Sequence, residues 1–289
     1  MTAAGVTPPE GRLIFDGQIH RYNVIGDHPR SRNGWYILHN DGIPSGAFGH
    51  WKTRISSNWC SRSLNFMSSV ERAEHRNRIT DACNQRQKIT VQRQQEAARR
   101  AQNILDLARP GHPKQQYLVN KQIAPYIACQ RGNTLVIPII KIAGKICSLQ
   151  FIHPDGFKVL LSGGAKKGNF MLVHGLINNS VIRIAEGFAT ACTLAQSYPD
   201  SCVIAAIDLG NLQPVATLIR HHWPEAKIII CADDDREQKD NPGATTGRAA
   251  AIAANALFIL PEWPEDAPTY LTDFNDLACW LVSNQRGSV

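Results

Sequence analysis

The second half of the chain alternates short apolar runs with segments of helical composition, and this alternation limits the possible folds more than any other feature. Helix-like segments separate four strand-like runs: VIRIAE, CVIAAID, AKIIICADDD and LFILP. Continuously apolar strands between amphipathic helices are typical of a parallel sheet that is covered on both faces. The sequence therefore predicts an α/β domain over residues 179–289, in a chain that is α+β overall.

Acidic residues follow three of these strands, at the edge where the ligands of such sheets bind. Glu186 ends the first run and precedes Gly187, which lets the chain turn into a helix. The third run ends in Asp233, Asp234 and Asp235, and the segment TDFNDL after the last run carries Asp273 and Asp276. We expect these three acidic sets to meet at one edge of the sheet.

Neighbouring carboxylates repel each other unless a cation neutralises them. Residues two apart in an extended strand point to the same face, so Asp233 and Asp235 can hold one hard cation while Asp234 points elsewhere. Oxygen ligands suit Mg²⁺ or Mn²⁺ rather than zinc. The pattern therefore predicts metal-assisted phosphoryl transfer, with a 3′-hydroxyl or water as the nucleophile. The alternative is that the three aspartates form a solvated turn or cap a helix.

The first 66 residues favour a small β-rich unit. RLIFDGQIHRYNV predicts a hairpin around Asp16-Gly17, and GWYILHNDGIPSGAFGHW predicts a second one around Asp41-Gly42. Four aromatic residues of this unit either stack on single-stranded bases or fill its core, and we favour the core: Trp35, Tyr36, Trp51 and Trp59.

Residues 67–113 are predicted to form a helical connector, because 68–108 contain neither Gly nor Pro. One long or two shorter exposed helices fit this composition. Residues 114–178 predict a small mixed α/β subdomain. It comprises a short helix at QQYLVNKQI, three strands with turns at Ala143-Gly144 and Asp155-Gly156, and a Gly/Lys loop, SGGAKKGNF. We thus divide the chain into 1–66, 67–113, 114–178 and 179–289.

Positive charge is concentrated in the first part of the chain. Residues 1–115 carry 17 Lys and Arg against 9 Asp and Glu, whereas residues 116–289 carry 14 against 15. Such a basic segment indicates a polyanionic partner or serves solubility alone, and the charge does not separate the two. The Gly/Lys loop, with Lys166 and Lys167, either cradles phosphate or is a plain flexible turn.

The cysteines and the hydropathy exclude other classes of protein. None of the eight cysteines forms a CxxC pair, so a zinc ribbon is excluded and no zinc is expected. Scattered cysteines without a secretory signal predict reduced, mostly buried thiols and a cytoplasmic protein. No apolar run reaches 18 residues, so no membrane span is expected.

The order IAEGFATA, CADDD, TDFNDL resembles a Toprim domain, the metal-binding module of DnaG-type primases, type IA and II topoisomerases and some nucleases. Upstream, TLVIPIIKIAGKICSLQFI and KVLLSGGAKKGNFMLVHGL resemble the subdomain that precedes Toprim in DnaG-type primases. The resemblance covers roughly 115–280 and is greatest to primases of conjugative plasmids, integrative elements and phages. The segment RYNVIGDHPRSRNGWYILHNDGIPSGAFGHWK is similar to the start of such plasmid-type proteins.

The resemblance implies roles for individual residues. Glu186 corresponds to the Toprim glutamate, and Asp233 and Asp235 to the D-x-D metal ligands, which makes these three the catalytic set. Asp273 and Asp276 correspond to the later acidic pair of metal ligands. Nucleotide or template contacts are expected from Lys145, Lys166, Lys167, Arg236 and Arg248. The chain departs from chromosomal primases at Thr190, where those proteins carry Asp, and it lacks their zinc-ribbon module.

This resemblance implies a primase that uses Mg²⁺ or Mn²⁺ to join ribonucleoside triphosphates into a short RNA primer on single-stranded DNA. It would serve plasmid, phage or conjugative replication, and would depend on a separate replicative helicase or relaxase because no P-loop is present. Two alternatives remain open: a Toprim metal-dependent nuclease, which would use the same carboxylates, and a non-catalytic nucleic-acid-binding module.

Overall fold

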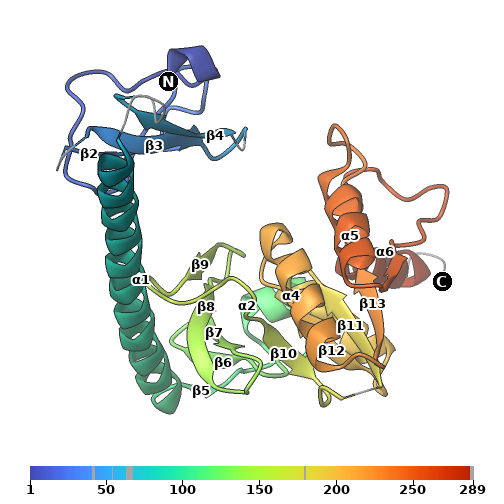
Figure 1. Ribbon diagram of the computed structural model, residues 1–289. Helices are drawn as coiled ribbons and strands as arrows, with labels where there is room; N and C mark the ends of the chain where they lie inside the picture. Colours follow the sequence, from blue (N-terminus) through green and yellow to red (C-terminus); the bar gives the residue numbers. More distant parts are fainter. Residues whose placement is uncertain (41–42, 54, 63–67, 179, 287–289) are drawn as a thin grey trace. The chain divides into compact units, whose positions relative to one another are not determined.

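The computed structural model describes residues 1–40, 43–53, 55–62, 68–178 and 180–286, and it divides the chain into two compact units, Met1–Ile89 and Thr90–Val289 (Figure 1). The boundary lies within helix α1 (Ser69–Asp106), a single 38-residue helix. One long helix, rather than two, therefore forms from the segment without Gly and Pro. The finer division into four segments stays a prediction.

The Met1–Ile89 unit contains a four-stranded antiparallel sheet in the order β1-β2-β3-β4. After a 3-10 turn, η1 (Thr2–Ala4), come β1 (His20–Tyr22), β2 (Gly34–His39), β3 (Ser45–His50) and β4 (Ile55–Cys60). A small core covers one face of the sheet and consists of Val6, Tyr36, Leu38 and Phe48. The pairing of β2 with β3 confirms the second hairpin, but its turn at Asp41-Gly42 lies outside the described residues.

The predicted hairpin around Asp16-Gly17 is wrong. The chain does bend there, but residues 12–15 form no strand, and β1 pairs with β2 instead. The Asp16 carboxylate accepts the N–H of Gln18 and contacts the His20 ring at 2.8 Å, while Gly17 donates its N–H to the carbonyl of Leu38. The bend is therefore satisfied by local contacts and by β2, and it needs no strand before it.

The aromatic residues of this unit divide between core and surface. Tyr36 is buried, which confirms the expectation for that residue. Trp51 is 50% exposed and Trp59 is 42% exposed, so the core assignment is wrong for both. The core of so small a sheet has room for few large rings, because only one of its faces carries it.

Asp27 is a hub of this unit. Its carboxylate accepts hydrogen bonds from Asn33 (2.7 Å) and contacts the ring of His50 (2.8 Å) and the ammonium of Lys52 (3.4 Å). The bonds from Asn33 and His50 lower the pKa of Asp27 to about 2. The carboxylate therefore stabilises the unit above about pH 4, and this stabilisation is lost as the pH falls towards 2.

We expect Asp27→Ala to lower the melting temperature of this unit by several degrees at pH 7, because Asn33 and His50 lose their shared acceptor. Hydrogen exchange of the full chain, followed by mass spectrometry, should show faster exchange in β2 and β3 and unchanged exchange in Thr90–Val289. Asp16→Ala, which removes an exposed local contact, is the matched control. Equal exchange in both variants would contradict a hub role.

The Thr90–Val289 unit begins with an antiparallel sheet in the order β5-β6-β7-β8-β9. Its strands are β5 (Arg109–Pro110), β6 (Cys129–Arg131), β7 (Thr134–Ile140), β8 (Ile146–Ile152) and β9 (Lys158–Leu160), and α2 (Gln116–Asn120) lies between the first two. These elements confirm the predicted short helix, three strands and two turns. Ala101 of α1 packs on Val136 and Leu149 of this sheet.

The second sheet of this unit has the order β10-β12-β11-β13-β14, with β10 antiparallel and the other strands parallel. Its strands are β10 (Met171–His174), β11 (Val181–Ala185), β12 (Cys202–Ala205), β13 (Lys227–Cys231) and β14 (Leu257–Ile259). The helices are α3 (Phe188–Ser197), α4 (Leu209–His222), α5 (Pro242–Ala253) and α6 (Phe274–Arg286). The predicted α/β class is confirmed, and the antiparallel edge strand β10 is an addition to it.

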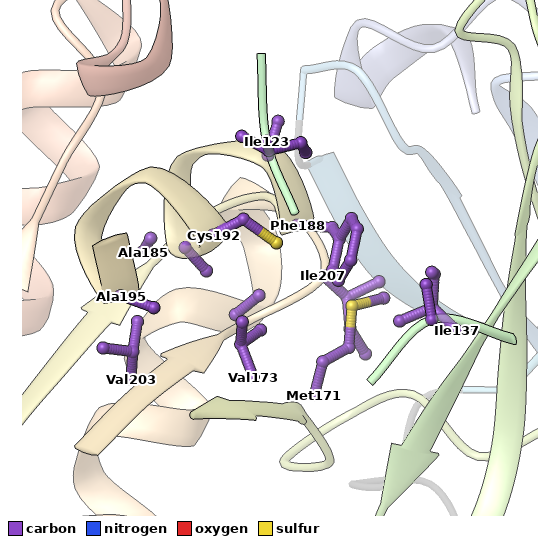
Figure 2. Close-up of a cluster of buried hydrophobic side chains, with 14 of the residues drawn as sticks. Ile123, Ile137, Met171, Val173, Ala185, Phe188, Cys192, Ala195, Val203 and Ile207 are labelled. Carbon is purple, nitrogen blue, oxygen red and sulfur yellow. The ribbon is translucent and has the colours of Figure 1, made fainter. Parts of the chain in front are cut away.

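Alternate residues of the central strands face two separate cores. Ile182 and Ile184 of β11 join a core with residues of α4 and α5. Ala185 joins the other core, in which Phe188 and Cys192 of α3 pack against residues of the first sheet such as Ile137 (Figure 2). Helices thus cover both faces of the sheet and leave the carboxyl ends of its strands as the place for a site.

All eight cysteines lie in the described residues and are free thiols. Cys147, Cys192, Cys202 and Cys231 are buried, whereas Cys83 is exposed, so the expectation of mostly buried thiols holds for half of them. In the described residues we find no helix that is long and apolar enough to span a membrane.

Candidate active site

The parallel pairing of β11 with β13 brings the first two acidic sets together. Ala185 lies opposite Cys231 in the register, so Glu186 and the aspartate run leave the sheet at the same edge. Strand β13 ends at Cys231, however, and Asp233 to Asp235 lie in the loop after it. The prediction that the aspartates extend the strand is therefore wrong, because the chain leaves the sheet before reaching them.

The three aspartates of the run have different partners. Asp234 points away, as predicted, and accepts hydrogen bonds from the Trp263 indole (2.9 Å) and the Asn241 amide (2.7 Å). Asp235 accepts the backbone N–H of Gly243 at 2.9 Å, at the start of α5. The helix-capping alternative thus describes part of the role of Asp235. Asp233 has a carboxylate oxygen, Oδ1, that is buried and has no hydrogen-bond partner among the described residues.

Burial and neighbouring charges raise the pKa values of carboxylates at this edge. Burial raises the pKa of Asp233 to about 8, and the charges of Glu186, Asp273 and Asp235 add to the effect. Burial, with Asp235 and Asp208, also raises the pKa of Glu186, although a backbone hydrogen bond from Leu209 opposes the shift. The structure therefore brings Glu186, Asp233, Asp235 and Asp273 together, as the sequence predicts, and we call these four residues the acidic set.

The fifth predicted ligand, Asp276, is engaged elsewhere. Its carboxylate accepts a hydrogen bond from Lys121 at 3.1 Å and another from the backbone of Thr272, and its own N–H bonds to the carboxylate of Asp273. Burial alone would lower the pKa of Lys121, but Asp273 and Asp276 outweigh it and raise that pKa. Asp276 and Lys121 thus fix the start of α6 and orient Asp273.

Lys158 of β9 is a site residue that the sequence reasoning missed. Its ammonium lies 3.9 Å from the position that a Cβ on Gly187 would take, and Gly187 is the residue that follows Glu186. Burial of the ammonium end and the charge of Lys121 lower the pKa of Lys158, while Asp273, Glu186 and Asp233 raise it. The residue as a whole is exposed, but its ammonium end is turned inward towards the acidic set, and burial leaves the pKa of Lys158 below its ordinary value.

The Gly/Lys loop is held beside this site. Lys166 forms an ion pair with Asp208 at 2.7 Å, and the charge of Asp208 in turn raises the pKa of Glu186. The side chain of Asn211, at the start of α4, accepts the N–H of Gly168 and donates to the carbonyl of Asn169. These bonds argue against a plain flexible turn. Ile207, before Asp208, has φ 84°, a strained value for a β-branched residue.

The other predicted nucleotide or template residues are either exposed or bonded within the fold. Lys145 is exposed in the turn between β7 and β8, and Lys167 is exposed in the Gly/Lys loop. The guanidinium of Arg236 donates to the carbonyls of Pro268 and Leu271. Arg248 is exposed on α5 and lies 4.7 Å from the centre of the Phe258 ring.

The acidic set fits a hard divalent cation in its chemistry. It offers only carboxylate oxygens, the charges repel one another, and Asp233 keeps one buried oxygen without a partner. In the described parts of the chain, no three Asp, Glu, His or Cys side chains stand close enough together to enclose a metal ion as they are. Cation binding would therefore draw these side chains inward.

Gly243 allows α5 to begin against the aspartate loop. A Cβ at this position would lie 2.5 Å from the carbonyl oxygen of Asp233 and 3.0 Å from the carboxylate of Asp235. We expect Gly243→Ala to displace the loop and to destabilise the fold by about 1–3 kcal/mol, the usual cost of overpacking. Urea unfolding measures this change, and Gly210→Ala, where a Cβ would meet only the carboxylate of Asp208 at an ordinary contact distance of 3.6 Å, is the control for the loss of a glycine. Equal unfolding midpoints for Gly243→Ala and the wild type would contradict the close approach.

The fold and the acidic edge define a known class of domain. Residues 181–280 match the Toprim domain family, from the first residue of β11 into α6. The chain therefore contains a Toprim domain. Along most of its length it is also related to DNA primases. It is 30% identical over 269 residues to a DNA primase TraC of Escherichia coli, covering 89% of this chain and 25% of that protein.

A second DNA primase TraC of Escherichia coli is 31% identical over 271 residues, covering 90% of this chain and 18% of the relative. The chain thus spans a quarter or less of the length of these curated relatives. A solved structure of the primase fragment of the bacteriophage T7 primase-helicase protein aligns with a TM-score of 0.41 and 16% identity, covering 58% of this chain and 70% of the other.

Proposed function

We propose that this chain is a DNA primase that synthesises short RNA primers on single-stranded DNA by metal-dependent nucleotidyl transfer. The observation that carries the proposal is the half-buried acidic set at the carboxyl edge of a Toprim sheet, in a chain related to DNA primases over most of its length. Glu186 and Asp233, whose pKa values are raised by burial and by neighbouring carboxylates, are costly to keep in a fold, so their presence favours a cation-dependent function.

Individual residues have distinct parts in this proposal. Glu186, Asp233, Asp235 and Asp273 would hold Mg²⁺ or Mn²⁺, which neutralises phosphate charge when bound. Asp276 positions Asp273 rather than holding the cation itself, since Lys121 occupies its carboxylate. Lys158 offers its ammonium to the phosphates of a ribonucleoside triphosphate beside the acidic set.

The other predicted Lys and Arg residues have different roles in this proposal. Lys166 and Lys167 would contact the template or nucleotide backbone from the Gly/Lys loop, which Asn211 keeps in place. Lys145 and Arg248 are exposed and suit contacts with phosphate. The guanidinium of Arg236 is bonded within the fold, so this residue supports the aspartate loop instead.

The relationship to TraC primases supports a role in plasmid, phage or conjugative replication, with a separate helicase or relaxase to expose the template. The test is primer synthesis on random and homopolymer single-stranded templates with labelled ribonucleotides, in Mg²⁺, Mn²⁺ or EDTA. We expect labelled primers that depend on template and on divalent cation. Shortening of the template without labelled primers would instead identify a Toprim nuclease.

A further inference from the structure

We propose that one face of the Met1–Ile89 sheet binds single-stranded DNA, through an aromatic platform that adjoins a basic groove. The inference rests on the proposed function, because the strand bound would be the template of the primase. Only residues within the Met1–Ile89 unit are involved.

The strand β2 has two different faces. Its residues Tyr36 and Leu38 point into the small core of the unit. Because side chains alternate along a strand, Trp35, Ile37 and His39 lie on the face opposite the core, which we call the open face. Ile37 is buried there and lines the cavity described below. Ladder pairing places Arg21 of β1 beside Trp35 on this face.

The aromatic platform consists of Arg21, Trp35 and Trp51. The rings of Trp35 and Trp51 have centroids 5.5 Å apart, and the guanidinium of Arg21 lies 5.4 Å from the centre of the Trp51 ring. Gly49 gives Trp35 its place, since a Cβ there would lie 2.7 Å from the indole. Trp51 remains 50% exposed, so part of its side chain is accessible to a ligand.

The basic groove continues along the open face, between the sheet and residues 78–86 of α1. It is a cavity of about 400 Å³ with a mostly apolar lining, which includes Ile37 of β2 and Ile79 of α1, and its basic side chains are His39, Arg78 and Arg86. The guanidinium of Arg86 contacts the His39 ring at 2.6 Å. None of its lining residues, all of which the structure describes, is Asp or Glu.

The chemistry of the open face selects a single strand of nucleic acid. Aromatic rings stack on bases of any sequence, and arginines neutralise phosphates. The bases of a duplex are already stacked on one another and cannot occupy the platform. Charge favours the same ligand, because residues 1–89 carry 12 Lys and Arg against 7 Asp and Glu. The cavity is also large enough for a nucleobase.

The test measures binding of a fluorescent 20-nucleotide oligothymidylate to the full chain by anisotropy, at several salt concentrations. We expect Trp51→Ala to weaken binding about tenfold, and Trp51→Phe, which keeps a ring, to restore most of it. Arg86→Ala should weaken binding and reduce the salt slope by about one phosphate contact. Lys88→Ala is its charge-matched control, because two residues further along a helix the side chain lies about 200° away, off the groove.

Binding is measured separately from catalysis so that the two proposals can fail independently. A variant with Asp233→Asn and Asp235→Asn should keep wild-type affinity for the oligonucleotide. If no primer is ever made but Trp51→Ala and Arg86→Ala still lower the affinity for the oligonucleotide, the primase proposal fails and the open face remains supported as a single-strand binding site. Unchanged affinity in both variants, or equal affinity of the wild type for a blunt duplex, would overturn the open face as a single-strand site. Circular dichroism of each variant shows that the fold is intact.

Discussion

Asp233→Asn should reduce primer synthesis by about 10²- to 10³-fold, the size of effect found when one charge-stabilising group is removed from a reaction centre. Burial and the neighbouring carboxylates raise the pKa of Asp233 to about 8, and one of its carboxylate oxygens has no partner among the described residues. Asparagine has nearly the same shape but carries no charge, so the loss would report charge rather than packing. The measurement is the initial rate of labelled primer formation at saturating Mg²⁺.

The same substitution should stabilise the fold. The folded pKa of Asp233, about 8, lies above its ordinary value of 3.8, so ionisation of this group opposes folding. Its cost is absent below about pH 4 and grows as the pH rises to 8. In EDTA, Asp233→Asn should therefore melt a few degrees above the wild type at pH 8 and close to it at pH 4.

Asp234→Asn is the control for Asp233→Asn. Asp234 is buried next to the site, but its carboxylate accepts bonds from Trp263 and Asn241. Asparagine must turn an N–H₂ group towards one of these donors, so this variant should melt below the wild type and keep most of its primer synthesis. An equal loss of synthesis in both variants would contradict a special role for the charge of Asp233. A melting temperature of Asp233→Asn below that of the wild type at pH 8 would contradict the claim that its ionisation opposes folding.

The sheet of the Toprim domain could be predicted from the sequence because its pattern is local. Each apolar strand is followed by its own helix, and parallel pairing follows from that order alone. The antiparallel strand β10 could not be predicted this way, since its pairing with β12 depends on residues some 30 positions away. The failed hairpin at Asp16-Gly17 has the same cause: the bend is encoded locally, but the partner of β1 is β2.

The acidic set could be predicted because carboxylates at strand ends are visible in the sequence. Its supporting residues could not. Lys158 lies on another sheet, Lys121 on the segment after α2, and Asn211 at the start of α4. Each reaches the site through tertiary folding, and none stands in a pattern that distinguishes it from other Lys and Asn residues. The dipeptide Pro242-Gly243 at the start of α5 was a usable signal for a close approach of this helix to the aspartate loop, because Gly243 permits the contact with Asp233.

Lys158→Met should strengthen the binding of the divalent cation and weaken the binding of the ribonucleotide. Removing the ammonium leaves the acidic set without a nearby positive charge that lowers the pKa values of Glu186 and Asp233. Divalent cations should then bind more tightly, because they no longer compete with a fixed charge. The ribonucleotide loses a phosphate contact, so kcat/KM for primer synthesis should fall on the order of 10- to 100-fold.

Titration calorimetry with Mn²⁺ measures the first effect, and primer synthesis over a range of ribonucleotide concentrations measures the second. Lys227→Met is the matched control, because Lys227 is exposed at the opposite end of β13 from the aspartate loop, and it should change neither quantity. If Lys158 only supported the fold, its replacement would weaken the binding of both Mn²⁺ and the ribonucleotide. Tighter Mn²⁺ binding with a higher KM for the nucleotide would instead place the charge of Lys158 between the cation and the triphosphate.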